Sequence, residues 1–200
     1  MKTERNSETK GQTSASLQRV LITGGSRGIG RACVEYFTAQ GCPVVFLYEK
    51  NSEAAASVAK STGAFSLRAD IADAAAATAA VEQAAAQMGG VDVVVNNAAV
   101  SAIRPFDTFT PEEWNRMLSV NLSGAFYVTR AAARYMIAQK YGRIINIGSM
   151  WGKTGASCEV AYSAPNAGLR GFTMALAQEV ATKGVTVNTV SPGYIATDMV

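Results

Sequence analysis

The sequence contains no histidine, and this absence excludes several kinds of catalytic site. Ser-His-Asp and Cys-His nucleophilic sites need an imidazole as the general base, and the common zinc enzymes bind their metal through imidazole. Cysteine is also scarce, because Cys33, Cys42 and Cys158 are the only three and they are scattered. They have neither the spacing of metal ligands nor that of a disulfide framework. We therefore predict no metal site and a reducing, cytoplasmic location.

Long apolar runs and dense charge are missing too. No apolar run approaches the ~18 residues that a membrane span requires. The N-terminal residues are polar and lack the hydrophobic segment of a signal peptide. The formal net charge is only +3, and no basic block occurs. These features predict no membrane and no nucleic acid as partner.

What is present suits one well-packed domain. The chain has 200 residues, of which 48% are hydrophobic, and its mean hydropathy is +0.10. This length is enough for a single sizeable core. Residues 1–18 are polar and predict a disordered tail. Residues 19–200 show no repeat, linker or shift in composition, so we assign them to one domain.

Two kinds of segment, apolar runs and alanine-rich stretches, alternate along that domain. Short apolar runs rich in β-branched residues occupy 20–22, 44–48, 65–69, 91–95, 143–147 and 185–190. Alanine-rich stretches with helical spacing occupy 31–40, 53–61, 74–88, 111–139 and 163–182. Strands that alternate with helices predict βαβ units and a parallel sheet covered on both faces, which is an α/β fold.

A glycine-rich turn, Thr23–Gly30, follows the first of these runs and precedes the first helix. Such a turn lets the backbone approach a pyrophosphate, and the helix N-terminus offers unpaired N–H groups to the anion. The spacing is G-x-x-x-G-x-G rather than G-x-G-x-x-G, and a plain βα turn remains the alternative.

Ligands of parallel α/β sheets bind beyond the carboxyl ends of the strands. That rule selects six segments as one contiguous rim. They are 23–30, 48–51, 70–71, 96–101, 148–151 and 191–197.

Ser149 and Tyr162 are the candidates for chemistry. Ser149 follows the fifth strand, and Tyr162 follows Ser149 by thirteen positions, near the start of a helix. A free tyrosine has a pKa of ~10, so proton transfer near neutral pH needs a positive charge beside it. A lysine one helical turn later would supply that charge, but Asn166 stands there. Alternatively, Ser149 could simply end a strand and Tyr162 could be an ordinary core residue. The spacing between the two residues disfavours these alternatives.

The motifs together resemble the short-chain dehydrogenase/reductase family over residues 18–200. The subgroup most similar is that of the 3-oxoacyl-(acyl carrier protein) reductases and acetoacetyl-CoA reductases. The residues that carry the resemblance are Thr23–Gly30, Asp70, Asn96–Ala99, Asn121, Ser149, Tyr162 and Pro192–Gly193.

The resemblance implies a fold, a reaction and an assembly. The fold is a three-layer, Rossmann-like, doubly wound parallel sheet in strand order 3-2-1-4-5-6, with the family's seventh strand missing from this sequence. The reaction is reduction of a 3-oxoacyl thioester of CoA or acyl carrier protein with NADP(H), alternatively NAD(H), in fatty-acid or polyhydroxyalkanoate biosynthesis. The assembly is a homotetramer formed through the two long helices.

The resemblance also implies roles for individual residues. Those implied to bind the cofactor are Gly24, Ser26, Arg27, Gly28, Ile29, Gly30, Tyr48, Asp70, Ile71, Asn97, Ala98, Ala99, Tyr162, Asn166, Pro192, Gly193, Ile195 and Thr197. Those implied to be catalytic are Asn121, Ser149, Tyr162 and Asn166. Ser149 would hold the substrate carbonyl, Tyr162 would protonate it, and Asn121 would interrupt its helix and hold a water.

Several of these roles have structural alternatives. Asp70 can cap a helix, Asn121 can be an ordinary polar residue within one, and Pro192–Gly193 can be only a turn. Tyr48 ends the second strand, where relatives that prefer NAD carry an acid. Glu49 would repel a 2′-phosphate and basic neighbours would attract one, so the balance favours NADP(H).

The sequence also departs from the family pattern. Asn166 stands where the family has a lysine, and Ala99 stands where it has a glycine. Pro165 directly precedes Asn166 and is expected to bias Ala164 away from helical geometry. The substrate-covering segment expected after the sixth strand is missing. We therefore expect weak activity. The alternatives are a dinucleotide-binding protein without catalysis and a non-functional fragment or chimera.

Overall fold

The computed structural model describes residues 17–197. The predicted tail, residues 1–18, lies outside this range except for its last two residues. One of these is attached to the domain, because the Gln18 side-chain amide donates a hydrogen bond of 2.6 Å to the Tyr141 hydroxyl.

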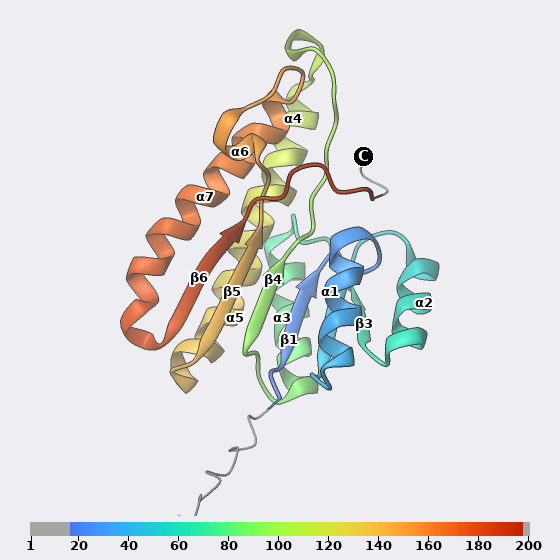
Figure 1. The fold of residues 1–200 in the computed structure, drawn as a ribbon, viewed down its shortest axis with the longest axis vertical. Coiled ribbons are helices and arrows are strands. Elements are labelled where there is room, and N and C mark those ends of the chain that lie inside the picture. The colour runs from blue at the N-terminus through green and yellow to red at the C-terminus, as the bar shows by residue number, and fades with distance from the viewer. Residues whose placement is uncertain (1–16, 198–200) are drawn as a thin grey trace, which may run out of the picture.

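A six-stranded parallel sheet forms the middle layer (Figure 1). Its strands are β1 (Val20–Thr23), β2 (Val44–Tyr48), β3 (Phe65–Arg68), β4 (Val93–Asn96), β5 (Gly142–Ile147) and β6 (Val185–Val190). Their spatial order is β3-β2-β1-β4-β5-β6, and every neighbouring pair is parallel. The predicted doubly wound α/β fold and its strand order are therefore confirmed.

Helices connect the strands. They are α1 (Gly28–Ala39), α2 (Ser52–Thr62), α3 (Ala74–Met88), α4 (Pro111–Leu118), α5 (Ala125–Gln139), α6 (Trp151–Thr154) and α7 (Val160–Val180). Local chemistry sets several of their ends. The Asp73 side chain caps α3 by accepting a hydrogen bond from the Ala76 N–H, and Gly89 ends that helix in the left-handed conformation. Thr110 and Glu113 form a reciprocal capping box at the start of α4.

Two hydrophobic clusters flank the sheet. Helices α3, α5 and α7 pack on one face against side chains such as Leu21 and Val94, while α1 and α2 cover the other face over Ile22 and Phe46. Strand β6 alternates between buried and exposed residues, since its second face is left uncovered in the described part of the chain. The expectation of a sheet covered on both faces thus holds for the central strands and fails at β6.

A buried polar network, which no local pattern had predicted, ties the strands to the helices. The Asn96 amide donates hydrogen bonds of 2.8 Å to Thr129 on α5 and to Asn146 on β5. Asn146 donates in turn to Thr173 on α7. Because buried amides need partners, this chain of bonds holds β4, β5, α5 and α7 in one register.

The two long predicted helices need correction. The stretch 111–139 is α4, a π-helical segment (Ser119–Gly124) and α5, rather than one regular helix. Helix α7 begins at Val160 and not at Ser163, so Pro165 lies inside it. Ala164 nevertheless stays helical, because the packing of α7 against α6 and the sheet outweighs the local bias from the proline.

Cys158 adopts a left-handed backbone conformation, with φ of 62°. This conformation is strained for a residue with a Cβ atom. We expect Cys158→Gly to raise the free energy of unfolding by about 1 kcal/mol, measured by urea denaturation. Cys158→Ala is the matched control, because it removes the thiol and keeps the Cβ atom. A glycine variant no more stable than the alanine variant would contradict the interpretation.

No helix within residues 17–197 is both long and apolar enough to cross a membrane.

Candidate active site

The glycine turn has the backbone geometry that its sequence suggested. Gly28 has a φ of 53°, in the left-handed region that glycine adopts without strain. A Cβ atom at Gly30 would overlap the carbonyl oxygen of Gly24. Glycine is therefore required both for the turn and for the close contact between the turn and α1.

The N-terminus of α1 lacks the side-chain groups that often bind the first N–H groups of a helix. Arg27 occupies the N-cap position without a side-chain capping bond, and the first turn contains no acidic residue. The first N–H groups of a helix have no partner within the helix. These N–H groups can therefore donate hydrogen bonds to an anion such as a phosphate group.

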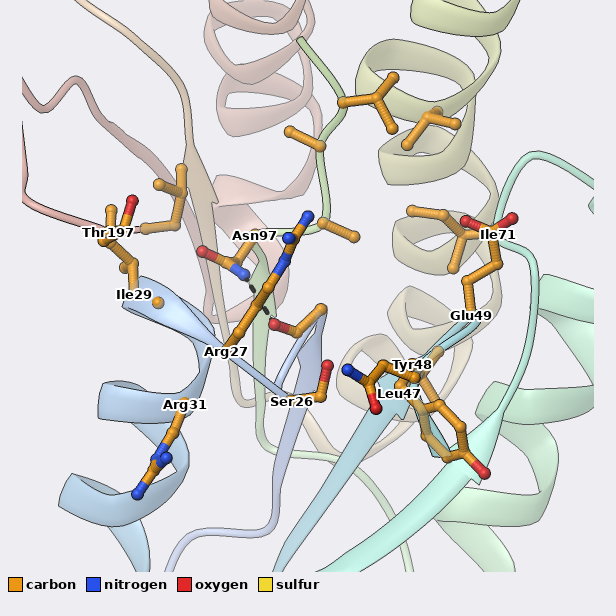
Figure 2. Close-up of a pocket in the computed structure, with 18 of the residues that line it drawn as sticks. Ser26, Arg27, Ile29, Arg31, Leu47, Tyr48, Glu49, Ile71, Asn97 and Thr197 are labelled. Atoms are coloured by element: carbon orange, nitrogen blue, oxygen red, sulfur yellow. Dashed lines mark hydrogen bonds between the residues drawn. The ribbon is translucent and has the colours of Figure 1, made fainter. Parts of the chain in front are cut away.

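A cavity of about 710 Å³ lies over the carboxyl ends of the strands, next to this helix end (Figure 2). Figure 2 shows the Arg27 side chain reaching into the open space, whereas Arg31 points back along α1. The segment after β6, coloured dark red in Figure 1, crosses above the strand tips toward α1. All six predicted rim segments contribute to the wall, as the strand-end rule predicted.

Most of the predicted residues line this cavity. They are Gly24, Ser26, Arg27, Gly28, Ile29, Tyr48, Asp70, Ile71, Asn97, Ala98, Ala99, Ser149, Tyr162, Pro192, Gly193, Ile195 and Thr197. Three predicted residues lie outside the wall, namely Gly30, Asn121 and Asn166. Their predicted roles remain predictions, and their positions follow from local contacts.

Two asparagine amides hold the loops around the cavity. Asn97 Nδ2 donates to the carbonyl oxygens of Thr23 and Gly24, which ties β4 to the glycine turn. Asn121 accepts a hydrogen bond of 2.8 Å from the Val100 N–H and donates one of 2.9 Å to the Val100 carbonyl. The Asn121 side chain thus anchors the loop after β4 from within the π-helical segment.

Ser149 and Tyr162, the two candidates for chemistry, both line the cavity. Burial is the main cause that raises the pKa of Tyr162, and the carboxylate of Glu159 raises it further. Hydrogen bonding with Ser149 and Asn166 opposes this shift without cancelling it. The phenol therefore holds its proton throughout the neutral range, but the raised pKa makes it a weaker acid toward a substrate oxygen.

Asn166 is buried, with 6% of its surface exposed. Its Nδ2 donates a hydrogen bond of 2.8 Å to the Tyr162 carbonyl, one turn earlier on α7. The side chain is neutral, so it supplies no charge that would lower the pKa of the phenol.

The structure adds residues that the site prediction missed. Glu49, Lys50 and Asn51 line the cavity beside Tyr48. The strand-end rule had selected their segment, and Glu49 and Lys50 had been considered only as charges near a 2′-phosphate. Arg116 on α4 was not predicted at all. Its guanidinium bonds both Glu49 and Asp70 on the cavity wall, and no sequence motif marks it.

A six-stranded parallel sheet with a bare helix N-terminus and a cavity at its strand ends defines a Rossmann-like nucleotide-binding protein. The family model described as short chain dehydrogenase matches residues 18–200, and the chain belongs to this family of oxidoreductases.

The chain is 41% identical over 180 residues to an acetoacetyl-CoA reductase of Shinella zoogloeoides, covering 90% of this chain and 75% of the relative. It is 40% identical to a 3-oxoacyl-(acyl-carrier-protein) reductase of Escherichia coli, covering 90% and 74%. A solved double mutant of a Serratia marcescens short-chain dehydrogenase/reductase is 34% identical, with a TM-score of 0.85, covering 90% of this chain and 75% of that one.

The family binds a nicotinamide dinucleotide, and the residues present fit that group. The free N–H groups of α1 suit its pyrophosphate. The wall of the same cavity also contains Asp70, Ser149 and Tyr162. Its volume lies within the range of pockets that hold small organic ligands.

Proposed function

We propose that this protein reduces a 3-oxoacyl thioester of CoA or acyl carrier protein to the 3-hydroxyacyl form with NADP(H), at a rate lowered by Asn166. The observation that carries the proposal is the presence of Ser149 and Tyr162 in the same cavity as the α1 N-terminus. The substrate class is supported by two relatives, an acetoacetyl-CoA reductase and a 3-oxoacyl-(acyl-carrier-protein) reductase, which are 41% and 40% identical to this chain.

Each side chain has a defined task in this reaction. When bound, the nicotinamide supplies the hydride. The Ser149 hydroxyl donates a hydrogen bond to the substrate carbonyl oxygen and orients it. Tyr162 donates its proton to that oxygen as negative charge develops there, and its raised pKa keeps the proton available. We propose that Asn121 supports proton resupply from within the π-helical segment.

The expected weakness of the enzyme rests on Asn166. The rate of a proton transfer depends on the pKa of the donor, and here no cation stabilises the phenolate that forms. The side chain also bonds a backbone carbonyl instead of lining the cavity. This observation favours a second candidate function, dinucleotide binding without catalysis.

The preference for NADP(H) is supported by charge. Arg27 and Lys50 line the cavity and would attract a 2′-phosphate, while Glu49 would repel one. The NAD(H) alternative requires Glu49 to be free for a ribose hydroxyl.

The acyl pocket is proposed from side chains that follow the ends of β4, β5 and β6. Trp151 and Tyr194 pack edge to face with ring centroids 6.0 Å apart, and Tyr194 is 74% exposed. Ser101 and Ile103 belong to the loop after β4. These side chains suit a small acyl chain, as in the acetoacetyl group.

We also propose a homotetramer built through α5 and α7, in the cytoplasm. Phe126 on α5 is 41% exposed and contacts Phe172 on α7, with ring centroids 6.2 Å apart. Met117 is buried, and Leu176 is partly buried against the core of the monomer, so neither is offered for the interface. An aromatic pair shared by two exposed helix faces is typical of an interface.

A fluorescence titration with NADPH, followed by a turnover assay with acetoacetyl-CoA, tests the proposal. We expect saturable NADPH binding, tighter than NADH binding, and slow turnover. Binding without turnover would favour the non-catalytic candidate. Absence of binding to both dinucleotides would refute the proposal, and turnover equal to that of the Escherichia coli reductase would refute the effect assigned to Asn166.

A further inference from the structure

Glu49 occupies the place where a carboxylate usually decides which dinucleotide binds. It follows the last residue of β2 and lies nineteen positions after Gly30. In dinucleotide-binding folds an acid about 20 residues beyond the glycine motif binds the ribose 2′-hydroxyl and so selects NAD. Figure 2 shows Glu49 at the cavity, next to Tyr48 and near Ile71.

Arg116 holds this carboxylate from a different part of the chain. Its Nη2 lies 3.0 Å from Glu49 Oε1, and its Nη1 lies 2.8 Å from Asp70 Oδ2. One guanidinium from α4 thus joins the tips of β2 and β3. Two other cations lie near Glu49. Lys50 Nζ is 3.5 Å from Glu49 Oε1 and 82% exposed, so it binds the carboxylate only weakly. Arg68 Nε donates its hydrogen bond to the Glu49 backbone carbonyl and not to the carboxylate.

Asp70 completes the arrangement. Its second oxygen accepts a hydrogen bond of 2.9 Å from the Ala72 N–H. Although partial burial acts against ionisation, the hydrogen bond from Arg116 and its charge hold the pKa of Asp70 below its usual value. The Asp70 carboxylate is therefore ionised at neutral pH, and the Arg116 guanidinium bridges it to Glu49.

We propose that Arg116 is a specificity-determining residue, which binds Glu49 and thereby lets the cavity accept a ribose that carries a 2′-phosphate. The proposal rests on the proposed function, since it concerns the adenosine end of the dinucleotide site. Without Arg116, two carboxylates face the phosphate and Glu49 is released toward the 2′-hydroxyl. The preference then moves from NADPH toward NADH.

Direct titration of NADPH and NADH against the full chain tests this inference, with no turnover involved. In Arg116→Gln, we expect the ratio of the NADPH to the NADH dissociation constant to rise about fivefold to tenfold, the effect of one unit charge near a partly exposed phosphate. The double variant Arg116→Gln/Glu49→Gln restores most of the original ratio, because the released carboxylate is gone. Arg134→Gln is the control, since it breaks a surface ion pair with Glu82.

The outcomes separate the hypotheses. Equal weakening of both dinucleotides in Arg116→Gln would make Arg116 a scaffold residue and overturn the inference, as would an unchanged ratio or a failure of the Glu49 change to restore it. Melting temperatures of all variants identify loss of folding. If the unaltered protein binds neither dinucleotide, the proposed function fails and this inference with it. If it binds them and the ratio is insensitive to Arg116, only the inference fails.

Discussion

Tyr162→Phe is expected to lower the rate of acetoacetyl-CoA reduction by about 10²- to 10⁴-fold, the usual contribution of a positioned proton donor. The variant keeps the aromatic ring and removes the hydroxyl group, which carries the proton and the hydrogen bond with Ser149. NADPH affinity should therefore change less than twofold. Steady-state kinetics and a fluorescence titration measure the two quantities separately.

Tyr36→Phe is the matched control, because Tyr36 is 63% exposed on α1. It should leave both quantities unchanged. If Tyr162→Phe retained the original turnover, the proton would come from another group, and the proposed catalytic role of this end of the cavity would be wrong.

Asn166→Lys is expected to raise turnover by about 10²-fold. The new ammonium lies one turn after Tyr162 on the same helix and favours the phenolate, so the pKa of Tyr162 falls. The sign of the pH effect follows. Oxidation of a 3-hydroxyacyl thioester needs the deprotonated phenol, so its pH profile should move to lower pH in the variant. The profile of the original protein should rise at higher pH than that of the variant, since burial raises the pKa of the Tyr162 phenol above its ordinary value.

Asn166→Met is the control for this variant, since it adds length without charge. It removes the amide that lowers the pKa of Tyr162, so it should neither raise turnover nor move the pH profile to lower pH. Asn166 is buried, so the lysine has a desolvation cost, and thermal melting should record a lower stability. A folded lysine variant with neither higher turnover nor a shifted profile would show that position 166 does not act on the phenol.

The strands and the phosphate-binding turn could be predicted because their signals are local. Val20–Thr23 is a short apolar run, and Gly28 and Gly30 mark a turn that only glycine can make. The boundaries of α3 were predicted to the residue, since Asp73 and Gly89 cap its two ends. The rule for strand ends then located the cavity, because parallel strands all point to the same edge.

The site could be predicted only in part, for a physical reason. Ser149 and Tyr162 belong to a recognisable spacing, and both line the cavity. Arg116 acts through residues 67 and 46 positions earlier, and no local pattern encodes such a pairing. The hydrogen bond from Asn166 to the Tyr162 carbonyl could not be predicted either, because tertiary packing determines which acceptors lie within reach of an asparagine side chain.

By itself, the sequence determined the succession of elements, the order of the strands through its family pattern, and the types of side chain at the strand ends. The family resemblance had placed an interruption of the helix at Asn121. Only the tertiary structure decided that this interruption is a π-helical segment in which Asn121 bonds Val100, and that Arg116 holds Glu49. Periodicity and capping are set by neighbours along the chain, whereas these contacts depend on which distant segments the packed sheet brings together.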